Sequence, residues 1–517
     1  MKLRALALVL FLFPEAALAQ DSIRVDLARP APRAQLGLAE ALSQARVNNP
    51  AYRRALNAAD PASWAVKNAY GDLLPQVNTS GSLGYTGSGA SSFGGATFEQ
   101  GSSAVTSSYN LSLGMTVSGR TLTAPSTQKA NERAVTEDIS ASGMILNNEI
   151  TIQYLTALQA TATREVARQQ VLRNQEFLDL AQARQQLGQG TILEVRQAQV
   201  TRGRSEIDFL VARQNEQEAI LELYRRMGVG LSVPVEMIAL SDSFPVTAPS
   251  FDLAELTRQA ENENPTLKAF RARESAAGYQ VKAAKSEYLP SVNLSAGWTG
   301  YTQDFNDTDL LINQATGRAM VNQSQCTFQN DLIGALPGGG IPGYPNGGAV
   351  PDCNAFSGLD PTGQTLLPEF SDAIIARNSN WPFSFTTQPF RASVSVSLPI
   401  FVGFNRSLQV SRANAAKADA EEFVRASELQ VRTEVQGRHL ALTASFQAIE
   451  VEQANRLAAG EQLTLAQERF RLGSGSALEV TDAQNAVTRA EASYVNAIYA
   501  YHKSVAALEF AVGRPLR

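Results

Sequence analysis

Two short segments combine glycines, a hydroxyl residue and a glutamate at one spacing. Residues 187–195 read LGQGTILEV, and residues 472–480 read LGSGSALEV. A glycine can take the left-handed conformation that ends a helix, and a serine or threonine followed three residues later by glutamate forms a capping box that begins the next helix. The pattern therefore predicts a turn between two helices in each segment. The residues that would form it are Gly188, Thr191 and Glu194 in the first segment, and Gly473, Ser476 and Glu479 in the second.

Other side chains that could do chemistry are few. His439 and His502 are the only histidines, and both lie in expected helices beside small or apolar residues. The motifs of serine hydrolases, zinc proteases, phosphate-binding loops and CxxC redox sites are missing from the sequence. We therefore expect no enzyme, no cofactor and no metal site. The net charge of −5 gives no reason to expect a nucleic-acid partner.

The chain has two cysteines, Cys326 and Cys353, in one segment rich in glycine and proline. In an exported protein such a pair predicts a local disulfide. Two free thiols are the alternative.

The N-terminus has the pattern of a secretory signal peptide over residues 1–19. Lys2 and Arg4 are basic, residues 5–13 are apolar, and Ala17 and Ala19 form a small-x-small cleavage site. An extended segment is expected next, over residues 20–37. No other run approaches the roughly 18 apolar residues of a membrane-spanning helix.

The sequence indicates two copies of one unit. At an offset of 215, ten of the thirty positions from Asn49 to Asn78 are identical to those from Asn264 to Asn293, including LPxVN at the end of both. The two LGxG segments align at an offset of 285. We predict a first repeat over 38–228, an equatorial linker over 229–252, and a second repeat over 253–517.

Each repeat is expected to contain a helix, two strands, a long helix, a tip turn and a return helix. Strict alternation of apolar and small polar residues predicts strands of about ten residues. The helical patterns cover residues 127–187 and 405–472, and the return helices 192–227 and 477–512. On the last helix, apolar and small residues from Val480 to Val512 follow the 3-4 spacing of a coiled-coil seam. Pro61 should kink or delay the first helix relative to its counterpart at Ala276.

Strands of this length with one apolar face are suited to crossing a bilayer. A sheet in lipid must close on itself, and four strands are too few to close. Several chains must therefore each contribute four strands. Residues 303–388, a second-repeat insertion where the first repeat has a short loop, are expected to form a long extracellular loop. Its two interpretations are capping or recognition at the barrel mouth, and a dispensable variable loop. Residues 336–348, LPGGGIPGYPNGG, are expected to lie outside helix and strand interiors.

Several motifs together resemble the TolC family of outer-membrane efflux and secretion channels. They are the opening LAEAL at residues 38–42 with Asn49-Pro50, the duplicated LPxVN, the strand end LPIFVG at 398–403, and the two LGxG turns. The resemblance implies a homotrimer of mainly α chains, in which four strands per chain complete a 12-stranded membrane β-barrel on a long coiled-coil α-barrel. It also implies a location in the Gram-negative outer membrane, with the helical part in the periplasm.

The function implied by this resemblance is a passive exit duct of a tripartite efflux pump or a type I secretion system. A periplasmic adaptor (a membrane fusion protein) and an inner-membrane RND or ABC transporter would dock at the tip and open it. The alternative is an exported trimeric coiled-coil adhesin or structural envelope protein, which would explain export and heptads but leaves the four alternating strands without a purpose.

By the resemblance, Glu479 and Asp482 align with the acidic positions of the family's periplasmic gate, and Phe470 aligns with a tyrosine of its locking network. Glu194 and Gln197 hold the equivalent places in the first repeat. Acidic rings attract cations, and crowded carboxylates favour retaining protons. The expected turn and adaptor-contact residues are Leu187, Gly188, Gly190, Thr191, Leu472, Gly473, Gly475 and Ser476.

Two positions depart from the family's pattern. Gly475 stands where the family can carry an arginine that ties the closed state, and Phe470 has no hydroxyl group. The sequence offers three arginines as substitutes: Arg196, Arg469 and Arg471.

Overall fold

The computed structural model describes residues 27, 34–93, 96–100, 102–378 and 381–516, which are mainly helical. The expected signal peptide, and most of the expected extended segment over 20–37, lie outside the described residues. The chain divides into two compact units. The helical unit comprises Met1–Ser63, Ala130–Ser275 and Ala418–Arg517, and the strand unit comprises Trp64–Lys129 and Ala276–Lys417. No helix in the described part of the chain is both long and apolar enough to cross a membrane.

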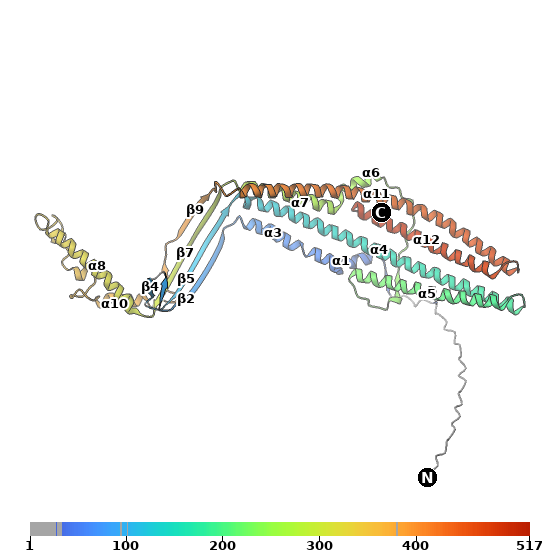
Figure 1. Cartoon of the computed structure of the whole chain (residues 1–517), viewed down its shortest axis with the longest axis horizontal. Helices are drawn as coiled ribbons and strands as arrows, with labels where there is room; N and C mark the ends of the chain where they lie inside the picture. The colour runs from blue at the N-terminus through green and yellow to red at the C-terminus, as the bar shows by residue number, and fades with distance from the viewer. Residues whose placement is uncertain (1–26, 28–33, 94–95, 101, 379–380, 517) are drawn as a thin grey trace, which may run out of the picture. The chain divides into compact units, whose positions relative to one another are not determined.

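Two helical hairpins dominate the chain (Figure 1). The first hairpin joins α4 (Gly119–Gln186) to α5 (Ile192–Met227), and the second joins α11 (Asn405–Arg471) to α12 (Ala477–Val512). Both return helices have their predicted bounds. At about 1.5 Å per residue, α4 and α11 are each roughly 100 Å long.

Helix α4 begins eight residues before its predicted start at Thr127, and it contains Pro125. The early start has a local cause at Ser118. Its hydroxyl accepts a hydrogen bond from the Thr121 N–H at 3.2 Å, and the Thr121 hydroxyl oxygen accepts one from the Ser118 N–H at 2.9 Å. This reciprocal cap satisfies the first turn and places Pro125 in the second turn of the helix.

The predicted seam of α12 is confirmed as the packed face of that helix. Its buried members are Val480, Ala483, Val487, Tyr501, Val505, Leu508 and Val512. The remaining members, Ala490, Tyr494 and Ile498, are partly buried against the same clusters.

The two Asn-Pro motifs each begin a helix. Asn49 caps α2 (Pro50–Leu56), which follows α1 (Leu38–Asn48), and Asn264 stands between α6 (Leu253–Glu263) and α7 (Pro265–Ser286). The Asn49 side-chain oxygen accepts from the Tyr52 N–H at 2.9 Å, and that of Asn264 accepts from the Thr266 N–H at 3.0 Å. Proline is suited to the first helical position because its missing N–H would be unpaired there.

The predicted effect of Pro61 is confirmed. The helix is interrupted at Asn57 and Ala58, before α3 (Ala59–Gly71), whereas α7 is continuous through the aligned residues. Both α3 and α7 end three residues before the leucine of the LPxVN motif.

The linker over 229–252 lies against the start of the described chain. It contains the 3₁₀ segment η1 (Val235–Met237) and β6 (Ile238–Leu240), which pairs in parallel with β1 (Ala34–Leu36). The buried Tyr154 hydroxyl donates to the Leu36 carbonyl at 2.9 Å, and burial raises the pKa of this phenol. The Tyr501 hydroxyl donates to the Thr247 carbonyl at 2.6 Å. The predicted linker is therefore bonded directly to the second hairpin through Tyr501, and it is connected to the first hairpin through β1.

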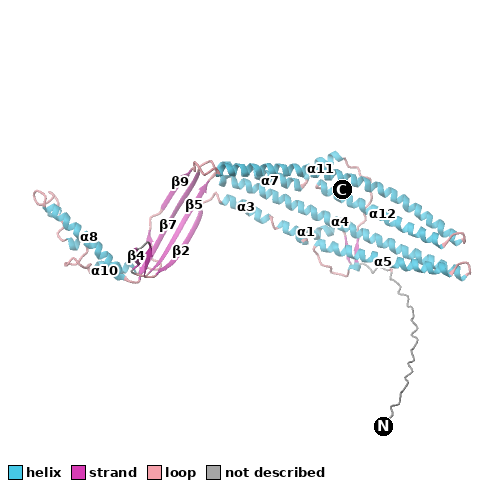
Figure 2. Ribbon diagram, viewed as in Figure 1, coloured by secondary structure: helices cyan, strands magenta, loops and turns pink. Residues whose placement is uncertain are grey.

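The strand unit contains the four predicted strands (Figure 2). They are β2 (Gln76–Thr86), β5 (Ala104–Val117), β7 (Ser291–Phe305) and β9 (Arg391–Ser397), antiparallel in that spatial order. A two-residue strand, β8 (Thr386–Thr387), also pairs with β7, and β3 (Gly89–Phe93) forms a separate hairpin with β4 (Ala96–Gln100).

The register of the sheet places apolar residues opposite apolar residues on one face and small polar residues opposite one another on the other face. Leu113 pairs with Ala296, which pairs with Ala392, so one face is apolar across neighbouring strands. On the other face the Ser295 and Ser393 hydroxyl groups lie 2.7 Å apart. The predicted alternation is thereby confirmed in three dimensions.

The insertion over 303–388 contains more regular structure than its sequence pattern predicted. It holds α8 (Thr308–Gly334), the 3₁₀ segment η2 (Pro345–Gly348), α9 (Cys353–Phe356) and α10 (Pro368–Asn378). Residues 336–348 form turns and η2. The predicted disulfide between Cys326 and Cys353 is confirmed, with 5.7 Å between the Cα atoms. α8 was missed because its apolar residues do not follow a single stripe.

Candidate functional site

The two LGxG turns need both of their glycines, for different reasons. Gly188 has φ 72° and Gly473 has φ 76°, which confirms the predicted left-handed helix ends. The second glycine of each turn lies close to the preceding helix. A Cβ atom on Gly190 would lie 3.2 Å from the Gln185 nitrogen, and one on Gly475 would lie 3.0 Å from the Phe470 nitrogen. An arginine at position 475 would therefore require the backbone to move.

The caps of the two return helices differ in completeness. The Thr191 hydroxyl oxygen accepts from the Glu194 N–H at 3.2 Å, and Glu194 Oε2 accepts from the Thr191 N–H at 3.1 Å, so the predicted capping box is confirmed. The Ser476 hydroxyl oxygen accepts from the Glu479 N–H at 3.2 Å. The second box was predicted to be complete, which is wrong: Glu479 Oε2 instead lies 3.4 Å from Arg469 Nη1. The carboxylate of Glu479 is therefore paired with Arg469 and not with the cap.

Arg184 and Arg469 occupy equivalent positions at the offset of 285, and each donates to its own turn. Arg184 Nη2 donates to the Gln189 carbonyl at 3.1 Å, and Arg469 Nη2 donates to the Ser474 carbonyl at 3.4 Å. Their other contacts differ. Arg184 Nη1 donates to the Phe470 carbonyl at 2.5 Å, which joins the first hairpin to the second.

Phe470 is a core residue, with 1% of its surface exposed. Its ring centroid lies 5.3 Å from that of Phe177 on α4, and the Arg184 guanidinium carbon lies 4.3 Å from the same centroid. This is within the range of a cation–π contact. The surrounding cluster takes buried residues from α4, α5, α11 and α12, so the ends of both hairpins share one apolar core.

A second polar link joins the hairpins further from the turns. Arg173 of α4 forms an ion pair with Glu491 of α12 at 2.9 Å, and it donates to the Thr488 hydroxyl at 3.3 Å. The Gln484 side chain donates to the Arg173 carbonyl at 3.3 Å. Arg173 and Arg184 were both missed at the sequence level. The alignment of Arg184 with Arg469 in the two turns could have identified Arg184 from the sequence.

The predicted acidic residues lie on the surface. Glu479 and Asp482 are exposed and line one shallow depression with Arg469 and Glu461. Gln197 is exposed, and Glu194 bonds within its own cap. Of the three candidate arginines, Arg469 reaches Glu479. Arg196 donates to Gln199 at 2.8 Å, and Arg471 pairs with Glu468 at 3.4 Å, so each bonds within its own helix.

Exposed leucines surround both turns. Leu187 and Leu472, which directly precede the first glycine of each turn, are 73% and 79% exposed. Leu193 and Leu478, equivalent at the offset of 285 and not singled out from the sequence, are 63% and 66% exposed. The same two apolar positions are thus exposed at both turns.

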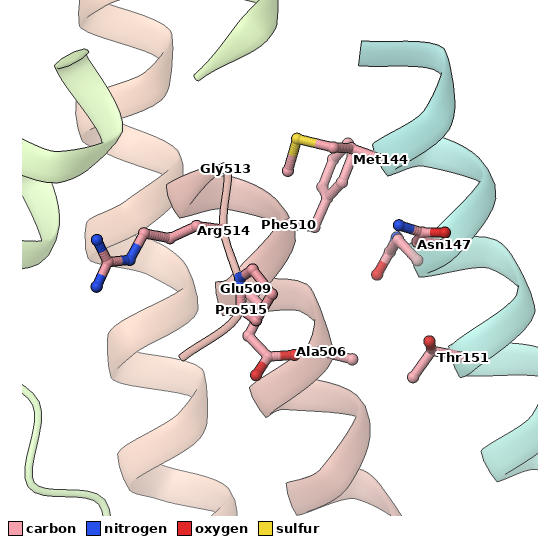
Figure 3. Close-up of a pocket in the computed structure, with 10 residues that line it drawn as sticks. Met144, Asn147, Thr151, Ala506, Glu509, Phe510, Gly513, Arg514 and Pro515 are labelled. Carbon is pink, nitrogen blue, oxygen red and sulfur yellow. The ribbon is translucent and has the colours of Figure 1, made fainter. Parts of the chain in front are cut away.

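A small pocket in the helical unit lies between α4 and the end of α12 (Figure 3). Its volume is about 150 Å³, and Met144 and Phe510 line it together with polar residues such as Asn147 and Thr151. Nothing in this lining indicates a reaction. Across the described residues, no cluster of histidine, cysteine, aspartate or glutamate could hold a metal ion.

Residues 41–229 and 356–514, more than half of the chain, match the family model described as outer membrane efflux protein. The chain belongs to this family. Membership places this outer membrane efflux protein in the Gram-negative outer membrane, with its helical part in the periplasm. Proteins of the family are channels rather than enzymes.

Solved structures of similar fold include the outer membrane protein VceC from Vibrio cholerae. It shares 16% identity with this efflux protein over 93% of this chain and 97% of that one, with a TM-score of 0.65. The Campylobacter jejuni CmeC outer membrane channel shares 14% identity over 92% and 85%, with a TM-score of 0.65. The open state of the Neisseria gonorrhoeae MtrE outer membrane channel shares 16% over 93% and 89%, with a TM-score of 0.62. At these identities the likeness shows a common fold. No curated protein matches the chain.

Proposed function

We propose that this efflux protein is the passive exit duct of a tripartite efflux pump or a type I secretion system. Three copies would form a 12-stranded barrel in the outer membrane and a helical barrel in the periplasm. Docking of a periplasmic adaptor and an inner-membrane RND or ABC transporter would open its tip. Energy would come from these partners, because the proposed duct is passive.

The observation that carries the proposal is the open sheet. Among the described strands, β2 pairs only with β5, and β9 pairs only with β7, so the sheet has two unpaired edges. Unpaired backbone groups are costly in lipid, and four strands are too few to close a barrel. Pairing the edge of one copy with that of the next removes both edges. Three copies would supply twelve strands.

The proposed gate is formed by the ends of the two hairpins. Repeated around a threefold axis, exposed Glu479 and Asp482 would form acidic rings that favour cations over anions. Glu194 and Gln197 would stand at the equivalent places on the first hairpin. Phe470 and Arg184 would keep each copy closed, because they tie its two hairpins together through the shared core and the bond to the Phe470 carbonyl.

The turns are the proposed contact surface for the adaptor. Leu187 and Leu472 are exposed beside their glycines, and an apolar partner surface would remove them from water. Leu193 and Leu478 extend each contact into the first turn of the return helix. The two turns of each copy would offer similar sites to neighbouring adaptor molecules.

The proposal is tested with the purified protein in a planar lipid bilayer, with its mass measured in detergent. We expect a trimer that gives discrete, cation-favouring conductance steps. A trimer without conductance would support the adhesin or scaffold interpretation instead, and a monomer would remove the basis for the closed barrel.

A further inference from the structure

The insertion between β7 and β9 is fixed to the end of the sheet by the buried side chain of Asn378, the last residue of α10. Its oxygen accepts from the Phe305 N–H at 2.8 Å, and its nitrogen donates to the Phe305 carbonyl and to Asp304 Oδ1, both at 2.8 Å. Asn378 is 8% exposed. The end of α10 is therefore bonded to the end of strand β7 through both atoms of one amide.

A second set of bonds holds the insertion to β5 and to the chain just before it. The Ser107 hydroxyl donates to the Pro382 carbonyl at 2.5 Å, and the Asp307 N–H donates to the Ser102 hydroxyl oxygen at 3.1 Å. At the far end of α8, the Asn330 side chain bonds both the carbonyl and the N–H of Val350, beside the disulfide. The insertion is thus a defined structure with a fixed base.

Helix α8 has one covered face. Ala319 and Cys326 are buried, and Leu311 and Ala315 line a groove opposite residues of α10 such as Ile374. The opposite face is open within the chain. Val321 and Phe328 are each 63% exposed there, and Leu332 is 54% exposed.

The open face follows the spacing of a helix–helix seam. Positions separated alternately by four and three residues lie along one stripe of a helix, as in a coiled coil. Over its 27 residues α8 has three charged side chains, Asp309, Arg318 and Asp331; the stripe contains none of them as far as Phe328, and Asp331 is its next position. We call this stripe the α8 seam; it consists of Leu310, Gln314, Gly317, Val321, Ser324 and Phe328.

We propose that the α8 seams of neighbouring copies pack against one another, so that the three insertions form a helical bundle at the end of the barrel. This inference rests on the trimer of the proposed function. The base of each insertion is bonded to β5 and β7, the inner strands of the sheet whose edges join the copies. Closing the barrel therefore brings the three insertions around one axis, next to one another.

The composition of the seam favours another copy over lipid as the occupant. Gly317 and Ser324 are small, which lets two helices approach closely, and Gln314 would be unpaired against acyl chains. A seam without charges brings no like-charge repulsion when it meets itself around a symmetry axis. Val321 and Phe328 supply the apolar area that such a contact buries.

The test is cysteine cross-linking in the full-length protein, with its native disulfide intact. Ser324→Cys changes a seam residue with little change in size, and Val321→Cys provides a second seam position. Asn322→Cys is the matched control, because this exposed neighbour lines the groove beside α10. Thiols held side by side have effective concentrations on the order of millimolar. Mild oxidation should therefore convert most of either seam variant into linked dimers and leave the control as single chains.

The failure of this inference can be distinguished from the failure of the proposed function. A seam variant that is trimeric by mass and conducts ions, yet stays unlinked on oxidation, overturns the bundle. Labelling by a water-soluble maleimide would then show whether the seam is open or covered by lipid or another part of the chain. A protein that is neither trimeric nor conducting would overturn the proposed function itself. Equal cross-linking at Asn322→Cys would also overturn the seam, because it indicates collision without register.

Discussion

The two tip turns have the same backbone conformation, but their side chains bond different partners. In both, a left-handed glycine ends the long helix, a hydroxyl residue caps the return helix, and an arginine donates to the turn. Arg184 also bonds the second hairpin, whereas Arg469 pairs with Glu479 on its own hairpin. The aligned residues that follow them differ: Gln185 is exposed and Phe470 is buried. Arg184 contacts both the carbonyl and the ring of Phe470, so this one position accounts for much of the asymmetry.

The largest effect is expected at this position. Phe470→Ala removes a buried ring from the shared core, and such substitutions typically cost about 3–5 kcal/mol. The aligned Gln185→Ala should change stability by less than about 0.5 kcal/mol, because the side chain is exposed. Hydrogen exchange of the helical amides beside both turns measures the difference. Similar protection in the two variants would contradict the importance that we give to the buried ring.

The next effect separates the two arginines. Arg184→Ala removes a charge-assisted bond between the hairpins, worth roughly 1.5–3 kcal/mol, which corresponds to an increase of about 10- to 150-fold in the open population. Arg469→Ala removes an exposed ion pair, for which about 0–1 kcal/mol is usual. Both effects are measured as the closed-state conductance of single channels of the proposed trimer in a planar bilayer.

Arg184→Lys serves as the control for charge alone, because lysine keeps the charge but loses the fork that reaches two carbonyl groups. If the lysine variant conducts like the original protein, charge rather than the two bonds keeps the tip closed. If Arg469→Ala opens the channel as far as Arg184→Ala, the comparison between the two turns fails.

Local patterns predicted much of the fold. The bounds of α5 and α12 follow from Thr191 and Ser476 at their starts and from Gly228 and Gly513 at their ends, which are all local signals. The four strands follow from alternation with a period of two. The start of α4 lies eight residues before its predicted position because the cap at Ser118 begins the helix ahead of Pro125, and α8 was missed because its apolar residues do not follow a single stripe.

The site was predicted less completely because its contacts cross between hairpins. The capping residues are local, so sequence spacing identified them, and Glu194 forms its box as expected. The direction of Arg184 depends on a carbonyl 286 positions away, which no local pattern encodes. Glu479 satisfied the capping pattern equally well, and the position of Arg469 decided its partner.

The third prediction concerns the charge of the two turns. Replacing both Glu479 and Asp482 with alanine would remove six carboxylates from a trimeric ring, and the preference for cations should fall toward that of a neutral pore. Glu194→Gln keeps a side chain that can cap and should change selectivity less, because this carboxylate bonds its own turn. Reversal potentials in a salt gradient measure both. An equal loss of cation preference in Glu194→Gln and in the double alanine variant would mean that both turns contribute equally to the proposed constriction.

The smallest effect tests the difference between the two caps. Glu194→Ala removes the acceptor of the Thr191 N–H, and loss of one such bond costs about 1 kcal/mol, or roughly fivefold faster exchange of that amide. Glu479→Ala should leave the exchange of the Ser476 amide unchanged, because its carboxylate is paired with Arg469. Site-resolved hydrogen exchange measures both amides in the same experiment. Faster exchange of the Ser476 amide in Glu479→Ala would mean that Glu479 caps its helix in solution. Its ion pair with Arg469 would then be the weaker contact, and the two turns would be more alike than the structure indicates.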